Sequence, residues 1–129
     1  MANEQKKPLR IAILGFGSMG RTHAFAVQSL PFYYDLPFRA EIAGVTTRSA
    51  EKSERICREF GFESPSVSED ELIFDPSIDI IDICTPNICH KDTILKAIRA
   101  GKHILCEKPL ASTAEEAKEI LAAITKGGK

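Results

Sequence analysis

The chain has 129 residues, of which 43% are hydrophobic and 27% are charged, a composition typical of one globular domain. Its 17 basic and 18 acidic side chains give a formal net charge of −1, so the chain has no excess of positive charge that would attract nucleic acid. No uncharged apolar run approaches the roughly 18 residues that span a bilayer, and residues 1–10 lack the apolar stretch of a signal peptide. The 4 cysteines form no CxxC pair, which favours reduced thiols. We therefore expect a cytoplasmic protein that binds neither nucleic acid nor membrane.

Four aliphatic runs of strand length occur along the chain, and stretches with helical spacing separate them. The strand runs lie at residues 9–14, 41–46, 78–84 and 103–106. They are apolar at nearly every position, which is typical of parallel strands covered on both sides. This alternation predicts an α/β fold, a doubly wound parallel sheet with helices on both faces.

Two helix starts carry the pattern of a capping box, in which a hydroxyl and a carboxylate three residues later accept amide hydrogens. The pairs are Ser68 with Glu71 and Ser112 with Glu115. The segment 31–39 is aromatic and breaks the helical spacing, so we expect an ordered connection there before the second strand.

A glycine motif follows the first strand run at once and opens a helix. It consists of Gly15, Phe16, Gly17, Ser18, Met19 and Gly20, the spacing GxGxxG. In this context Gly15 would form the tight turn, Gly17 would let the backbone approach a pyrophosphate, and Gly20 would let the helix pack closely on the strand. We therefore predict that these six residues bind a dinucleotide; the alternative is a glycine turn without a ligand.

The end of the second strand run indicates which dinucleotide is bound. An NAD site places an acidic residue there, about 20 residues beyond the glycines, to accept the ribose hydroxyls. Here Thr47, Arg48 and Ser49 stand in its place, and a guanidinium flanked by hydroxyls suits a 2′-phosphate. We expect NADP to be preferred over NAD. Alternatively, Arg48 is solvated and Ser49 is the N-cap of the next helix, and Ser49 could serve both purposes.

The third strand run is followed by a polar segment at the edge where open α/β sheets bind ligands. Its candidate cofactor-binding residues are Thr85, Pro86, Asn87 and His90. Pro86 disfavours helix at Thr85, and Asn87 could cap a helix whose first turn holds His90. Cys84, Cys89 and His90 could hold a metal ion, but Cys84 lies in the strand and no fourth ligand is near in sequence, so we expect no metal site.

The fourth strand run ends in an acid and a base, Glu107 and Lys108, at the same edge of the sheet. They could form a surface ion pair. Alternatively, Lys108 could polarise a substrate hydroxyl or carbonyl beside the nicotinamide. His23 shares an apolar helix face with Met19 and Val27, which predicts a packed histidine rather than a catalyst.

Three segments taken in order, GFGSMGRTHA, TPNICH and GKHILCEKPLA, resemble the Gfo/Idh/MocA family of NAD(P)-dependent oxidoreductases over nearly the whole chain. The resemblance implies that the glycines hold the cofactor phosphates and that Thr47, Arg48 and Ser49 lie at the adenosine ribose. It also implies that Thr85, Pro86 and Asn87 lie along the cofactor. Glu107 and Lys108 would lie near the nicotinamide ribose and the substrate, as cofactor-binding and catalytic residues. Hydride would pass between nicotinamide and a sugar, cyclitol or related small substrate.

Members of this family are usually two to three times longer, with a second domain that forms the substrate pocket and much of the oligomer interface. We expect residues 1–129 to be the dinucleotide-binding (Rossmann) domain alone, without the last strand or the substrate domain, and with weak activity by itself. An uncovered sheet edge would favour a homo-oligomer. The alternative function is a non-catalytic dinucleotide-binding module that acts with a partner chain. A methyltransferase is disfavoured, because the second strand lacks the acid that such an enzyme would use for the ribose.

Overall fold

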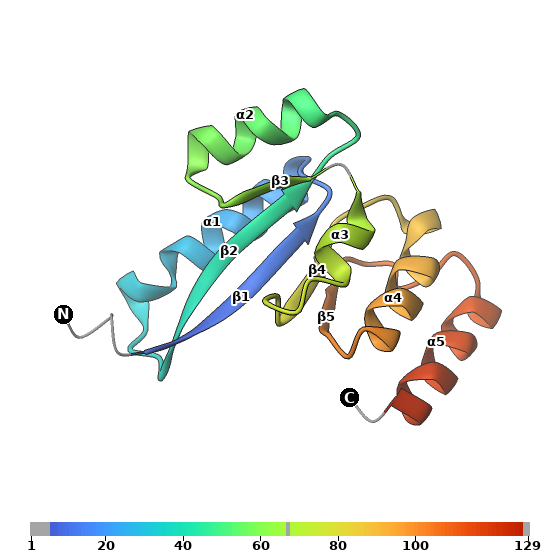
Figure 1. Ribbon diagram of the computed structural model, residues 1–129. Coiled ribbons are helices and arrows are strands. Elements are labelled where there is room, and N and C mark those ends of the chain that lie inside the picture. The colour runs from blue at the N-terminus through green and yellow to red at the C-terminus, as the bar shows by residue number, and fades with distance from the viewer. Residues whose placement is uncertain (1–5, 67, 128–129) are drawn as a thin grey trace.

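The structure is a computed structural model that describes residues 6–66 and 68–127, with strands and helices in alternation (Figure 1). The strands are β1 (Lys7–Leu14), β2 (Phe38–Thr46), β3 (Ser64–Ser66), β4 (Ile80–Ile83) and β5 (His103–Cys106). The helices are α1 (Ser18–Tyr33), α2 (Ala50–Phe60), α3 (Glu69–Ile73), α4 (His90–Arg99) and α5 (Ala114–Gly127), and a short 3-10 turn (Asn87–Cys89) precedes α4. No helix in these two ranges is both long enough and apolar enough to cross a membrane.

The strands form one 5-stranded sheet in the order β3-β2-β1-β4-β5, and all neighbours run parallel. The chain builds outward from β1 in one direction through β2 and β3, then returns to pair β4 with the other side of β1. This reversal between β1 and β4 leaves a crevice at their carboxyl ends, where open α/β sheets bind ligands. The predicted doubly wound parallel sheet is confirmed.

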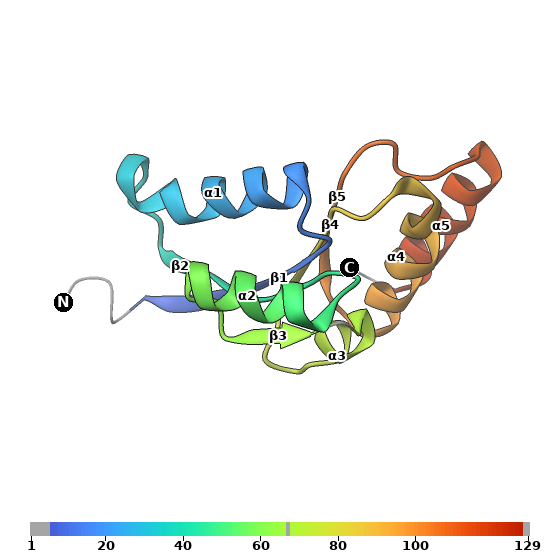
Figure 2. The same ribbon diagram turned by 90° about the horizontal axis from the view of Figure 1, so that it is seen from above.

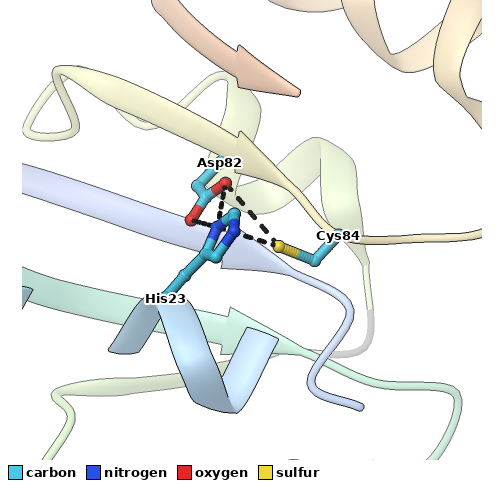
Figure 3. A group of neighbouring side chains, drawn as sticks. All are labelled: His23, Asp82 and Cys84. Atoms are coloured by element: carbon cyan, nitrogen blue, oxygen red, sulfur yellow. Dashed lines mark hydrogen bonds and ion pairs between the residues drawn. The ribbon is translucent and has the colours of Figure 1, made fainter. Parts of the chain in front are cut away.

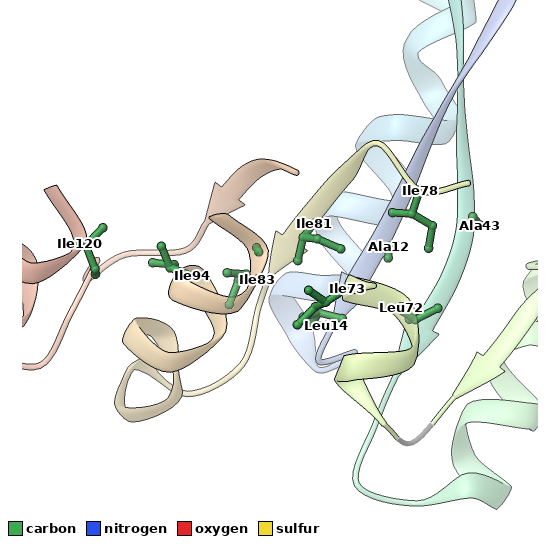
Figure 4. Packing of buried hydrophobic residues seen from close by; sticks show 11 residues of the cluster. Ala12, Leu14, Ala43, Leu72, Ile73, Ile78, Ile81, Ile83, Ile94 and Ile120 are labelled. Carbon is green, nitrogen blue, oxygen red and sulfur yellow. The ribbon is translucent and has the colours of Figure 1, made fainter. Parts of the chain in front are cut away.

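Helices cover both faces of the sheet, as predicted. Figure 2 shows α1 on one side of the strands and α3 on the other. Buried side chains of α1 and α2 pack on one face together with Ile13 of β1. On the other face α3 and α4 cover Leu14 together with Ile81 and Ile83 of β4, and α5 packs against α4 (Figure 4). Because side chains alternate along β1, this one strand contributes residues to the hydrophobic core on each face of the sheet.

Two elements differ from the sequence-based expectation. Strand β3, Ser64–Ser66, has no aliphatic residue, and only its pairing with β2 makes it a strand. Helix α1 continues through Pro31 to Tyr33, although a connection was expected from residue 31. Because Pro31 lies in the last turn, it removes one helical hydrogen bond near the end, and Tyr34 N–H still donates to Leu30 O at 2.9 Å.

The start of α5 lies one residue later than the predicted capping box. Thr113, rather than Ser112, precedes the helix, and its hydroxyl accepts a hydrogen bond from Glu116 N–H at 3.1 Å. The Glu116 carboxylate accepts from Ser112 N–H at 2.9 Å, so Thr113 supplies the capping hydroxyl and Ser112 contributes its backbone amide. For α3 the predicted start is correct, since Ser68 is its N-cap residue, but the Ser68 side chain makes no capping hydrogen bond to the helix.

Candidate functional site

A pocket of about 410 Å³ opens at the carboxyl ends of β1, β2 and β4, in the crevice that the strand order creates. Its lining residues come from the glycine loop, the end of β2, the start of α2 and the segment after β4. They are Gly15, Phe16, Gly17, Thr46, Thr47, Arg48, Lys52, Glu69, Cys84, Thr85, Pro86 and Cys89. Seven of these twelve were predicted from the sequence.

The three glycines of the loop meet different surroundings. Gly15 has φ +87°, and a Cβ on it would lie 2.9 Å from the carbonyl oxygen of Cys84. A Cβ on Gly20 would collide with the carbonyl oxygen of Gly15, so α1 packs against the loop as closely as the sequence predicted. A Cβ on Gly17 would meet no atom within 4 Å. Gly15 and Gly20 are therefore required by the fold, whereas the space at Gly17 is open and belongs to the pocket.

The N-terminus of α1 suits a phosphate group. Gly17 is its N-cap residue, no side chain caps it, and its first turn contains no acidic residue. The first amide hydrogens of a helix have no acceptor within the helix, and the helix dipole favours a negative charge there. Ser18 and Met19, also predicted to bind cofactor, are exposed in this first turn. A dinucleotide pyrophosphate fits this end of the pocket.

A buried hydroxyl supplies a second sign of fit. Among the described residues, the Thr85 hydroxyl is one of two buried side-chain polar atoms without a hydrogen-bond partner. Thr85 lines the pocket together with Pro86, whereas Asn87 lies in the 3-10 turn beside it. A buried polar group without a partner costs free energy. The wall formed by Thr85 thus contains a group that the protein itself leaves unsatisfied.

The end of β2 leaves two cations at the pocket. Ser49 is the N-cap of α2, and its hydroxyl accepts from Lys52 N–H at 3.3 Å. The Thr47 hydroxyl donates to Ser49 O at 2.8 Å and also contacts the Ser53 hydroxyl at 2.9 Å. These two hydroxyls therefore serve the turn, and Arg48 and Lys52 remain as charged lining groups. Lys52 was missed, although its place one turn beyond Arg48 puts both at the start of one helix.

His90 lies beneath the pocket lining rather than in it. Its side chain is buried, and its ring nitrogens each lie 2.8 Å from a backbone carbonyl oxygen, that of Thr85 and that of Pro109. The histidine therefore joins the segment after β4 to the segment after β5. His90 was predicted to contact the cofactor. Because its ring is buried behind the pocket lining, it supports the two segments instead.

Glu107 and Lys108 follow β5, and their side chains have different environments. Glu107 N–H donates to Ile83 O at 3.0 Å, which holds the turn against β4. Its carboxylate Oε1 lies 2.9 Å from His23 Nε2, so Glu107 pairs with this histidine rather than with Lys108. Lys108 is exposed at the carboxyl edge of the sheet. The surface ion pair between neighbours, one of the two alternatives, is not formed.

His23 is not the packed histidine that its helix face predicted. It reaches across to β4, where its Nδ1 lies 2.8 Å from Asp82 Oδ2 and 3.4 Å from Cys84 Sγ (Figure 3). The buried face of α1 is formed instead by Gly20 and Ala24. An available sequence signal was Asp82 itself, because a carboxylate inside an apolar strand run requires a partner.

Hydrogen bonds account for the contacts among His23, Asp82 and Cys84 without a metal ion. His23 Nδ1, an Asp82 carboxylate oxygen and Cys84 Sγ lie within 4.8 Å of one another, close enough to share an ion. However, the thiol donates to Asp82 Oδ1 at 3.6 Å, and burial, with the Asp82 charge, raises the pKa of Cys84 well above its usual range. Hydrogen bonds therefore hold the three groups together, and we assign no metal to the cluster.

The doubly wound sheet, the glycine loop at a helix N-terminus and the pocket at the strand reversal define a dinucleotide-binding domain. The family described as "Oxidoreductase family, NAD-binding Rossmann fold" matches residues 9–129. The chain belongs to this family, the Gfo/Idh/MocA oxidoreductases, which confirms the resemblance noted in the sequence.

Similar proteins are dehydrogenases of sugars and cyclitols. Levoglucosan dehydrogenase from Pseudarthrobacter phenanthrenivorans is 38% identical, covering 90% of this chain and 30% of that protein. The scyllo-inositol 2-dehydrogenase (NAD(+)) of Bacillus subtilis is 38% identical, covering 85% of this chain and 30% of that protein. A solved structure of levoglucosan dehydrogenase in complex with NADH and levoglucosan has a TM-score of 0.89 at 34% identity, covering 94% of this chain and 33% of that one. The chain thus spans about a third of the length of these relatives.

Proposed function

We propose that this chain is the dinucleotide-binding domain of an NAD(P)-dependent oxidoreductase and that its pocket holds the cofactor. The open space at Gly17, facing an uncapped helix N-terminus, carries the proposal, because it is where a pyrophosphate can approach the backbone. The relatives that bind NADH or use NAD(+) support it.

We further propose that the adenosine ribose lies at the end of β2 and that NADP is preferred over NAD. The turn after β2 offers no carboxylate to the ribose hydroxyls, and Arg48 and Lys52 line the pocket at that end. A guanidinium can bind a 2′-phosphate through two parallel hydrogen bonds, and a second cation adds to the attraction. Glu69 also lines the pocket, and its carboxylate accepts a hydrogen bond from Thr93 Oγ1 at 3.1 Å.

Calorimetric titration with NADPH and with NADH at one salt concentration tests both statements. We expect tighter binding of NADPH. Arg48→Ala should weaken NADPH by about 1.5 to 3 kcal/mol, the range of a hydrogen bond to a charged group, and leave NADH nearly unchanged. Lys52→Ala should act in the same direction.

Arg58→Ala is the matched control, because it removes an equal charge from α2 at a residue outside this pocket. It should change neither affinity. Equal losses for NADPH and NADH in Arg48→Ala would mean that Arg48 contacts the adenine and does not read the phosphate. Binding of neither nucleotide to the parent chain would overturn the proposed function.

In the reaction that we propose, the nicotinamide accepts or gives a hydride, and a sugar, cyclitol or related small molecule is the other partner. In this reaction the chain would orient the cofactor and supply one polar group, the ammonium of Lys108, to the substrate. The backbone bond from Glu107 to Ile83 fixes the turn after β5, and the exposed ammonium of Lys108 stands at the carboxyl edge. From there Lys108 would donate a hydrogen bond to the substrate oxygen, and its charge would stabilise the negative charge that forms on that oxygen.

Lys108→Ala in the full-length, active protein tests this role. Turnover should fall by about 10²-fold or more, as for loss of a general acid or base, while cofactor affinity stays nearly constant. Unchanged turnover would remove Lys108 from the mechanism.

We also propose that the protein forms a homo-oligomer. Among the strands of residues 6–66 and 68–127, β5 lies at an edge of the sheet, and Leu105 on it is 51% exposed. An edge strand with an exposed apolar side chain is a surface that a second copy can cover. Sedimentation equilibrium of the full-length protein tests this, and a monomer at all concentrations would contradict it.

A further inference from the structure

Histidines hold the turn after β5 from both faces of the sheet. On the α4 side, buried His90 contacts Pro109 O at 2.8 Å. On the α1 side, His23 contacts the Glu107 carboxylate at 2.9 Å. Lys108 lies between these two anchored residues. The backbone position of Lys108 therefore depends on contacts made by its neighbours in the chain.

The contacts of His23 require it to carry a proton on each ring nitrogen. Nδ1 lies 2.8 Å from Asp82 Oδ2, and Nε2 lies 2.9 Å from Glu107 Oε1. Ionised carboxylates only accept hydrogen bonds, so both nitrogens must donate, and only the imidazolium can do so. The Asp82 side chain is 2% exposed and the Glu107 side chain 20%, which shields both contacts from water. A neutral ring would leave one of these carboxylates without its donor.

His23 is the cation that balances the charges around it. Asp82 faces it from β4 and Cys84 from the residue after that strand, and Cys106 and Glu107 belong to β5 and its turn. Burial raises the pKa of Cys106 to about 11, and the pKa of Cys84 is raised further, so both thiols are neutral. Burial by itself would lower the pKa of His23, but the hydrogen bonds and charges of Asp82 and then Glu107 outweigh it and raise that pKa above 6.5. Two carboxylates and one imidazolium remain, so loss of the proton leaves two negative charges facing each other.

We infer that His23 is a positioning residue whose imidazolium, clamped between Asp82 and Glu107, holds the turn that carries Lys108 at the carboxyl edge of the sheet. The inference rests on the proposed function for the purpose of Lys108, but the clamp itself does not depend on it. When the imidazolium loses its proton, Glu107 loses its charged donor and the turn loosens. When the clamp is closed, the backbone of Lys108 is held between two anchored neighbours.

Nuclear magnetic resonance of the unmodified chain tests the clamp without any variant. At pH 6 both ring nitrogens of His23 should show the signature of N–H groups, and the ring should titrate above the ordinary 6.5. Exchange of the Glu107 amide hydrogen, which is bonded to Ile83 O at 3.0 Å, should quicken by about tenfold or more as pH rises through this transition, after correction for the intrinsic pH dependence.

Two variants separate a positioning role from a merely structural one. Glu107→Gln keeps the shape and an acceptor oxygen but removes the charge, so the titration of His23 should move downward and the pH dependence of amide exchange at position 107 should flatten. His103→Asn, at an exposed position of β5, should change neither. In the full-length protein, Glu107→Gln should lower turnover and flatten its pH dependence across the titration of His23.

Three results would overturn the inference. One is a neutral His23 ring at pH 6, and another is amide exchange at Glu107 that does not follow the titration of His23. The third is Zn²⁺ binding that displaces a ring proton of His23 at micromolar metal, which would mean that the cluster is a metal site. Absence of NADPH and NADH binding would overturn the proposed function alone, since ring titration and amide exchange are measured without cofactor.

Discussion

Gly17 and Gly20 stand in one motif, but the space around each gives it a separate task. Gly20 is buried where α1 crosses the loop, and a methyl group there would meet the carbonyl of Gly15. At Gly17 a methyl group would meet only the open pocket. A single extra carbon atom therefore distinguishes a residue needed for folding from one needed for binding.

We expect Gly17→Ala to cost less than about 1 kcal/mol of the free energy of unfolding, the difference between Gly and Ala at an N-cap. It should weaken NADPH by about 1.5 to 3 kcal/mol, because the added methyl group prevents close approach of the phosphate to the amides. Gly20→Ala should instead cost about 1 to 3 kcal/mol of stability by overpacking. Urea denaturation and calorimetry of both variants give the two numbers. Equal losses of stability and of NADPH affinity in the two variants would contradict the separate roles of Gly17 and Gly20.

The residue scale also shows where sequence patterns are insufficient. The glycines could be predicted because each is required by backbone geometry within one loop. His23 could not, because its partners Asp82 and Glu107 are 59 and 84 residues away along the chain. Helical spacing placed it on an apolar face, whereas a charge partner on a distant strand decides its orientation. Lys52 was missed for another reason, since a lysine on a helix surface carries no distinguishing pattern.

At the scale of elements, the local signals located the helices well but left the first residue of α5 undecided. Two hydroxyls adjoin the start of α5, and each is followed by a glutamate three residues later: Ser112 by Glu115 and Thr113 by Glu116. The sequence alone gives both pairs the same pattern. The structure selects Thr113, whose hydroxyl accepts from the amide of Glu116.

This choice predicts a difference between two neighbouring substitutions. Thr113→Ala should lower the free energy of unfolding by about 1 kcal/mol, because an amide hydrogen of α5 loses its acceptor. Ser112→Ala should change it by less than about 0.5 kcal/mol, because Ser112 contributes its backbone amide, which alanine keeps. Urea denaturation of the two variants measures both. A larger loss in Ser112→Ala would restore the original prediction.

At the scale of the whole molecule, the sheet was predictable because its signals agree with one another. Continuous aliphatic strands such as Ile11–Leu14 indicate burial on both sides, and parallel strands need helices between them. β3 escaped prediction because Ser-Pro-Ser owes its strand conformation to β2 alone. The pocket followed from topology, since β1 and β4 are neighbours in space and distant in sequence, and their carboxyl ends meet at Gly15 and Cys84.

The pH dependence of stability brings these scales together. Arg10, through its hydrogen bond to the carboxylate, lowers the pKa of Glu63 below 4.5 in the folded protein. The contribution of this pair to stability is therefore present above pH 4.5 and is lost as pH falls through the pKa of the folded state. The pKa of His23 is raised above 6.5, so its contribution is complete below pH 6.5 and is lost as pH rises through the folded value. Burial raises the pKa of Cys57 above 9.0, and of Cys84 and Cys106 likewise, so stability falls again above pH 9.

We therefore expect the free energy of unfolding to be greatest between about pH 4.5 and pH 6.5, where the carboxylates are ionised and His23 is protonated in both states. Urea denaturation at intervals from pH 3 to pH 10 measures the curve. In Glu107→Gln the loss of stability above pH 6.5 should be smaller, because the imidazolium has lost one of its two charge partners. The loss of stability at acid pH should be unchanged. In Glu63→Gln the acid limb should shrink and the alkaline limb should stay. A stability maximum above pH 8 would contradict the assignment of His23 as the cation on which two carboxylates depend.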